Sequence, residues 1–167
     1  MPGSGSRAAG RDDGHRPVLL QLLALKVLDG HLRNRHQLMD PPLSDLRGLD
    51  AAEASLLIRA MSAAAHADGR LDADERRAIA AALAAADQLD AAEKRRLEES
   101  IDEPPCLESL VRQVGAARTA ARFYAVSLRT VDRNSKLALA YLGYLAQRLG
   151  LPGDFVLRLN RQFGMRV

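Results

Sequence analysis

A five-residue phrase, Leu-Asp-Ala-x-Glu, occurs three times in this chain and fixes where helices begin. In each copy the Asp carboxylate can accept hydrogen bonds from the exposed amides of a first helical turn. The Glu three residues later can reach back to the cap amide, and both negative charges lie at the positive end of the helix dipole. The copies occupy residues 49–53, 71–75 and 89–93. They predict helices over about 50–66, 72–87 and 90–101, with Gly69 as the C-terminal cap of the first.

The sequence beyond these copies continues with helical spacing of apolar residues. It predicts further helices near residues 106–114, 116–131, 135–149 and 153–163. No segment alternates apolar and polar residues over six or more positions, as a half-buried strand would. The fold class is therefore predicted to be all-α, with a helical domain over residues 50–165.

Residues 1–49 are expected to stand apart from this domain. Residues 1–16 are rich in Gly, Ser, Arg and Asp without a hydrophobic period, which predicts a flexible tail. Leucines and valines recur at helical spacing over residues 17–39, which predicts a separate, amphipathic accessory helix. Pro41 and Pro42 stop that helix, and residues 40–49 are predicted to form a Pro-containing linker.

The accessory helix at residues 17–39 has four possible uses that the sequence leaves open. Its apolar face can dock on the bundle, form a homodimer or bind another protein. It can also lie on a membrane surface and turn Lys26, Arg33 and Arg35 toward lipid phosphates.

Composition narrows the setting of the protein. The chain has 167 residues, enough to bury a core without a disulfide or metal. A single cysteine, Cys106, excludes a disulfide framework, and no apolar run approaches the roughly 20 residues of a membrane span. We therefore expect a cytoplasmic protein. The net charge of +3 conceals a net −6 over residues 41–105 and a net +7 over residues 106–167.

The densest group of carboxylates lies between the first two predicted helices of the domain. Asp68, Asp72, Asp74 and Glu75 fall within eight residues. The other two copies of the phrase have the capping Asp and Glu but lack the upstream Asp-Gly and the extra Asp. Oxygen ligands favour Ca²⁺ or Mg²⁺, so we predict a divalent-cation site here, beside the simpler role of capping a helix. An ordinary EF-hand is excluded because Ala64 and His66 stand where its first two carboxylates belong.

Two separated blocks of this sequence resemble a known family. Residues 57–76, around the acidic corner, resemble the first conserved block of the TerB-like, tellurite-resistance superfamily, and within it the YebE-like branch of unknown function. Residues 124–135 and 140–151 resemble the second block. The resemblance implies a compact bundle of about seven helices with two pseudo-equivalent acidic corners. It also implies cation binding and inner-membrane association in some members. We accordingly expect a non-enzymatic binding or sensing module in a bacterial stress or envelope context.

The two acidic corners match the family's pattern to different extents. The first corner matches at Asp68, Asp72 and Glu75. At the second corner Asp132 is present, Asn134 stands where an Asp is common, and Ala138 occupies the position of the acid in the following helix. The second corner is therefore not expected to bind a metal ion.

The basic C-terminal half suggests a weaker alternative. Arg118, Arg122 and Arg129 fall on one helical stripe, which predicts a solvated face or a surface for sequence-nonspecific binding of anions or nucleic acid. Tyr141 and Tyr144 follow helical spacing and are predicted to lie in the core. No phosphate loop, catalytic triad or metal-hydrolase motif is present. Cys106 is predicted to be a small buried residue.

Overall fold

The computed structural model describes residues 42–165, which form one unit beginning at Pro42. The predictions for residues 1–16 and 17–39 lie outside the described residues. Within that range the chain is all-α and contains no strand, as predicted. The helices are α2 (Ala51–Ala65), α3 (Ala73–Ala85), α4 (Ala91–Glu99), α5 (Leu107–Val111), α6 (Ala117–Thr130), α7 (Lys136–Arg148) and α8 (Gly153–Gln162). No helix of this part is long and apolar enough to cross a bilayer.

The three repeated phrases begin α2, α3 and α4, as predicted. The carboxylate of Asp50 accepts from the amide of Glu53 at 2.8 Å, and that of Asp90 accepts from the amide of Glu93 at 2.7 Å. Asp72 does the same at α3. The leucines that precede these caps pack against the core, so each start is tied to the bundle as well as capped.

Two helix ends differ from their predicted positions. The helix α5 stops at Val111 rather than near residue 114, because the amides of Gln113 and Val114 donate to carbonyls three residues back in tight turns. The C-cap of α2 is His66, not Gly69. Gly69 instead takes a φ of 86° in the turn that follows, where its amide donates to the His66 carbonyl. Glycine is favoured at such a φ because it has no Cβ.

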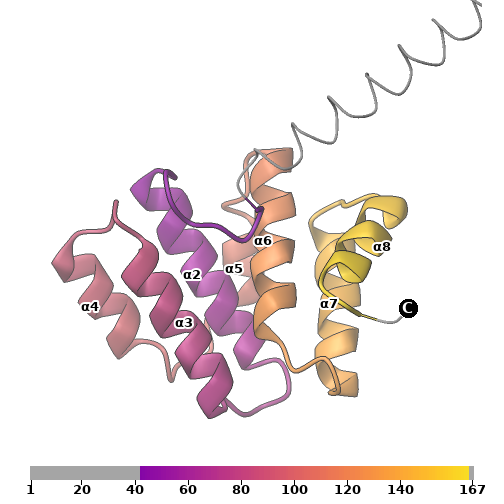
Figure 1. The fold of residues 1–167 in the computed structure, drawn as a ribbon, viewed down its shortest axis with the longest axis horizontal. Coiled ribbons are helices and arrows are strands. Elements are labelled where there is room, and N and C mark those ends of the chain that lie inside the picture. Colours follow the sequence, from indigo (N-terminus) through magenta and orange to yellow (C-terminus); the bar gives the residue numbers. More distant parts are fainter. Residues whose placement is uncertain (1–41, 166–167) are drawn as a thin grey trace, which may run out of the picture. The chain divides into compact units, whose positions relative to one another are not determined.

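The core is built on the contact between α2 and α6 (Figure 1). Ten of the 15 residues of α2 and ten of the 14 residues of α6 are buried. Both helices are therefore covered nearly all round, as a central helix must be. In Figure 1 the helices α3 and α4 lie on the α2 side of this pair, whereas α7 and α8 lie on the α6 side.

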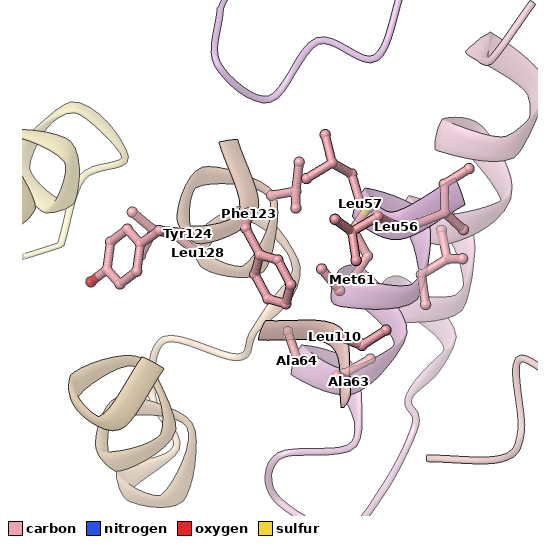
Figure 2. Packing of buried hydrophobic residues seen from close by; sticks show 14 of the residues in the cluster. Leu56, Leu57, Met61, Ala63, Ala64, Leu110, Phe123, Tyr124 and Leu128 are labelled. Atoms are coloured by element: carbon pink, nitrogen blue, oxygen red, sulfur yellow. The ribbon is translucent and has the colours of Figure 1, made fainter. Parts of the chain in front are cut away.

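Two neighbouring aromatic residues of α6 pack on opposite sides of that helix. Phe123 points toward Met61 of α2 and Leu110 of α5, whereas Tyr124 points the opposite way (Figure 2). Both side chains are fully buried. The Tyr124 hydroxyl donates to Oδ1 of Asn160 in α8 at 2.9 Å. A single helix thus organises both flanks of the bundle.

Residues 42–49, predicted to belong to a linker, pack on the bundle. Leu46 is only 3% exposed and belongs to the core. Its carbonyl accepts from Nε2 of Gln88 at 2.8 Å, and the Asp45 carbonyl accepts from Nη1 of Arg122 at 3.0 Å. The apolar residues of this Pro-containing segment explain the packing, since burying each one removes apolar surface from water.

Candidate functional site

The acidic corner joins α2 to α3, and its carboxylates are held by backbone amides. Oδ1 of Asp72 accepts from the amides of Asp74 and Glu75, each at 2.8 Å. Oε2 of Glu75 accepts from the amide of Asp72 at 3.0 Å, which closes a capping box. Asp74 forms an ion pair with Arg77 on the exposed side of α3. The predicted capping role of Asp72 and Glu75 is confirmed.

Asp68 and His66 shape the turn that precedes this cap. Oδ1 of Asp68 accepts from the amide of Arg70 at 3.1 Å, which is an Asx turn. Nδ1 of His66 lies 2.8 Å from the carbonyl oxygen of Ser62, one turn back in α2. His66 therefore closes the end of α2, and Asp68 sets the path of the chain toward α3.

Glu75 differs from the other corner carboxylates because it is buried. It is 5% exposed, whereas Asp72 and Asp74 are exposed. Burial raises the pKa of Glu75, and the charges of Asp72 and Asp68 raise it further. The hydrogen bond from the Asp72 amide, and to a smaller extent the nearby backbone of Asp132, lower this pKa. Glu75 thus lies near the segment between α6 and α7, a proximity that the sequence did not predict.

The second corner repeats the layout of the first with different side chains. Oδ1 of Asp132 accepts from the amide of Asn134 at 2.9 Å, as Asp68 does from the amide two residues on. The cap of α7 is Ser135, whose hydroxyl accepts from the amide of Ala138 at 3.3 Å. Ala138 holds the helical position that Glu75 holds in α3, and it is buried. The acid of the first corner is replaced here by a small core residue.

As placed, the corner carboxylates do not form a ready-made cation site. Across residues 42–165, no group of three or more His, Cys, Asp or Glu side chains is arranged to hold a metal ion. Asp72 and Glu75 each commit one oxygen to the capping box, and Asp74 is turned to Arg77. A cation bound by the predicted set of Asp68, Asp72, Asp74 and Glu75 would have to rearrange the start of α3.

The Glu residues of the other two phrases do not reach back to their cap amides. Oε1 of Glu53 accepts instead from the Thr119 hydroxyl of α6 at 2.9 Å. Oε1 of Glu93 accepts from the Ser55 hydroxyl of α2 at 2.9 Å. These contacts join segments far apart in the sequence, so the local phrase could not reveal them. They tie the starts of α2 and α4 to neighbouring helices.

The basic stripe of α6 is only partly a surface. Arg118 and Arg129 are exposed, but Arg122 is buried. Nε of Arg122 lies 4.0 Å from Oε1 of Glu53 and has no hydrogen-bond partner among the described residues. Most of α6 is covered by neighbouring helices, and this places Arg122 inside, so a continuous stripe of three exposed arginines is not formed.

Helix α7 presents an unexpected surface. Lys136 and Arg148 are its only charged residues, and no charge lies between them. Its exposed side nevertheless includes Leu137, 61% exposed, and Tyr144, 47% exposed. The prediction that Tyr144 lies in the core is therefore wrong. Leu139, Ala140 and Gly143 are also exposed. The same helical spacing that suggested a core residue also fits an apolar face on the outside.

Glu108 of α5 anchors the C-terminal end of this face. Its Oε1 accepts from the Tyr144 hydroxyl at 2.6 Å and from Nε of Arg148 at 2.8 Å. These two donors lower the pKa of Glu108 to about 2. Nearby, Cys106 begins α5 and is exposed, which contradicts its predicted burial. Its place at a helix start directly after Pro104 and Pro105 keeps it at the surface.

Comparisons with known proteins add a family to this description. A comparison with curated proteins and one with solved structures each find no match. The family model described as "Protein of unknown function (DUF533)" matches residues 19–163. That match covers most of the chain, including all of α2 to α8. The chain therefore belongs to the DUF533 family.

Proposed function

We propose that this protein is a non-enzymatic, TerB-like binding module that uses the outward face of α7 to engage a protein partner. The observation that carries this proposal is the absence of charge on an exposed helix. From Leu137 to Gln147 the helix has no charged residue, yet Leu137, Leu139 and Tyr144 are exposed to solvent. These three, together with Leu157 of α8, are the large apolar side chains exposed in the described residues.

The physical reason is the usual composition of a surface helix. Such a helix turns its apolar stripe to the core and carries charged or polar residues on the opposite face. Helix α7 has its core stripe, formed by Ala138, Leu142 and Leu145. Its opposite face is also apolar, and the Tyr144 hydroxyl on that face donates a hydrogen bond to Glu108. Exposed apolar side chains gathered on one helix without charges are typical of interaction surfaces.

Photo-crosslinking in the cells that make the protein tests the proposal. Benzoylphenylalanine in place of Tyr144 is expected to give a covalent protein adduct after irradiation. The same residue in place of Ala80, which is exposed on α3, serves as the matched control and is expected to give none. Equal adducts at both positions, or none at position 144, would contradict the proposal.

A second candidate function is a response to divalent cations at the acidic corner. The observation that favours it is the crowding of Asp68, Asp72 and Glu75 at one turn, where burial first and then the charges of Asp72 and Asp68 raise the pKa of Glu75. A cation would relieve this repulsion, at the cost of rearranging the cap. Titration calorimetry with Ca²⁺ and with Mg²⁺ tests the candidate. Asp68→Asn keeps an acceptor for the Asx turn and removes one charge. Cation binding by the wild type, and weaker binding by this variant, would support the candidate function. The absence of any heat of binding in the wild type at millimolar cation would refute this candidate function.

The wider setting follows the family resemblance. We propose a place in the TerB-like superfamily, near the YebE-like branch, because two blocks resemble that branch in order and both corners repeat one layout. A cytoplasmic location, with peripheral contact at the inner membrane, fits this proposal. Fractionation of cells tests it, since release of the protein from membranes by high salt is expected only for peripheral contact.

The burial of Arg122 argues against the nucleic-acid alternative, because it removes the middle member of the arginine stripe from the surface.

A further inference from the structure

We infer that residues 17–39, whose sequence predicts an amphipathic helix, fill an apolar groove of the same chain between α3 and residues 42–47. The groove has a volume of about 330 Å³, and all of its lining residues belong to the described part of the chain. The lining comes from α2, α3, α6 and the segment that begins at Pro42. This surface is different from the exposed face of α7, so the inference does not depend on the proposed function.

The lining of the groove is mostly apolar. Met61 of α2 and Val126 of α6 are part of it and are 3% and 1% exposed. On the α3 side the lining residues are small and leave room for larger side chains from outside: Ala81, Ala82 and Ala85. From Ala78 to Ala85 the helix has no polar side chain, whereas a helix that faces water carries polar residues on its outer side. The groove therefore has the chemistry of a surface that another apolar element covers.

The covalent chain brings residues 17–39 to this groove. Pro42 is the first described residue, and it is itself part of the lining. Three residues of chain span the step from Met39 to Pro42, so the Cα atoms of these two residues lie at most about 11 Å apart. The C-terminal end of the segment is therefore within reach of the groove. Because the tether is short, the segment has a high effective concentration there, which favours it over an untethered occupant.

The segment supplies large apolar side chains that match the small ones of the groove. In a helix, Leu25, Leu28 and Leu32 are spaced i, i+3 and i+7, so they share one face. Lys26 and Arg33 fall on a different side of that helix and can stay in water. Docking removes two apolar surfaces from water at once, that of the leucines and that of the groove.

The charges at the rim of the groove fit the same occupant. Arg129 of α6 lines the groove and is exposed. The other arginine of the lining, Arg47, forms an ion pair with Asp45 at 2.8 Å. Asp40 lies two residues before Pro42, so their Cα atoms are at most about 7 Å apart. Arg129 is therefore the cation with which this acid of the incoming chain can pair.

Photo-crosslinking of the purified full chain tests the occupant. Benzoylphenylalanine in place of Ala81 is expected to join to a residue within 17–39, as located by mass mapping of peptides. Ala80 is also an exposed alanine of α3, but it does not line the groove and is rotated by about 100° around the helix. The same substitution there is the matched control and is expected to join to none of these residues. No adduct from position 81, or equal adducts from both positions, would overturn the inference.

Mixing isotope-labelled and unlabelled chains identifies which copy supplies the segment. The expected adduct from position 81 joins two peptides of the same label. Adducts that join a labelled to an unlabelled peptide would assign the groove to residues 17–39 of a second copy, and an adduct to another part of the chain would assign it to a different occupant. Either result would overturn the inference.

Amide hydrogen exchange in the full chain gives a second readout. Ala81→Glu places a charge in the groove and is expected to speed exchange over residues 17–39 by about tenfold, while α2 and α6 keep their protection. Ala80→Glu is the matched control and is expected to exchange like the wild type. Leu28→Glu changes the segment instead of the groove and is expected to have the effect of Ala81→Glu, with Lys26→Glu as its control. Exchange over residues 17–39 that is the same in the wild type and in Leu28→Glu would overturn the inference even if Ala81→Glu did not fold.

Discussion

Asp72 and Glu75 hold each other at the start of α3: each carboxylate accepts a hydrogen bond from the other residue's backbone amide, at 2.8 and 3.0 Å. The same two residue types begin α2 and α4, but only this pair is closed in both directions. The reciprocal bond satisfies two amides that would otherwise lack an intrahelical partner. It also holds the carboxylate of Glu75 in a buried position near the backbone of Asp132.

Loss of the cap at α3 is expected to destabilise the bundle. Asp72→Ala removes the acceptor for two amides and should lower the free energy of unfolding by about 1–2 kcal/mol. Asp72→Asn keeps an acceptor and should cost less. Asp90→Ala, which removes one capping bond, should lie at the low end of the same range. Urea denaturation of the three variants measures their free energies of unfolding. A loss of free energy in Asp72→Ala no larger than that in Asp72→Asn would contradict the prediction.

Glu75 is expected to make the protein less stable as the pH rises above the range of an ordinary carboxyl. Its pKa is raised in the folded state from 4.5, so the native state keeps a proton that the unfolded state releases. The stabilisation is fully present below pH 4.5 and is lost as the pH rises through the folded pKa. Glu75→Gln keeps the acceptor for the Asp72 amide and cannot ionise. The difference in unfolding free energy between wild type and this variant should therefore change over that window, and a constant difference would contradict the prediction.

Glu108 is expected to titrate in the opposite direction. Hydrogen bonds from Arg148 and Tyr144 lower its pKa from 4.5 to about 2. Stability from this group is fully present above pH 4.5 and is lost as the pH falls through about 2. The side chain is exposed, so solvent screens the effect. Carbon-detected NMR titration should show the low pKa in the wild type and a value nearer 4.5 in Arg148→Ala. An unchanged pKa in that variant would refute the assignment.

Local and long-range determinants separate clearly in this chain. The caps at Asp50, Asp72 and Asp90 were predictable because each depends on residues within three positions. That Glu75 lies near the backbone of Asp132 was not predictable, because it depends on how α3 is placed beside the segment after α6. No spacing rule tells whether a helix lies at the centre or at the edge of a bundle.

The same reason explains the two misplaced side chains. Arg122 was expected on a basic stripe and is buried, because the middle of α6 is covered by neighbouring helices. Tyr144 was expected in the core and is exposed, because α7 has an apolar face on both sides. The charged Arg122 is buried because it lies on the central helix α6, and the aromatic Tyr144 is exposed because it lies on the outer side of α7.

Arg122 is expected to stabilise the fold more through its stem than through its charge. Its Nη1 donates to the Asp45 carbonyl, but its Nε is buried without a partner. Arg122→Ala should cost about 3 kcal/mol, since it leaves a cavity and unpaired neighbours. Arg122→Met should cost less, because the apolar side chain fills the space without a desolvated nitrogen. Arg118→Ala, at an exposed position of the same helix, is the control and should stay within about 0.5 kcal/mol of wild type. A Met variant as unstable as the Ala variant would assign the main role to the charge.

Gly143 is expected to cost the folded chain stability. Alanine at this position should raise the free energy of unfolding by about 0.5–1 kcal/mol, since alanine is a better helix former and its Cβ would meet no atom within 4 Å. Gly69→Ala is the matched contrast, because Gly69 has a φ of 86° that disfavours a side chain, and it should lower the free energy of unfolding. Urea denaturation of the two variants measures both changes, and a destabilised Gly143→Ala variant would contradict the prediction.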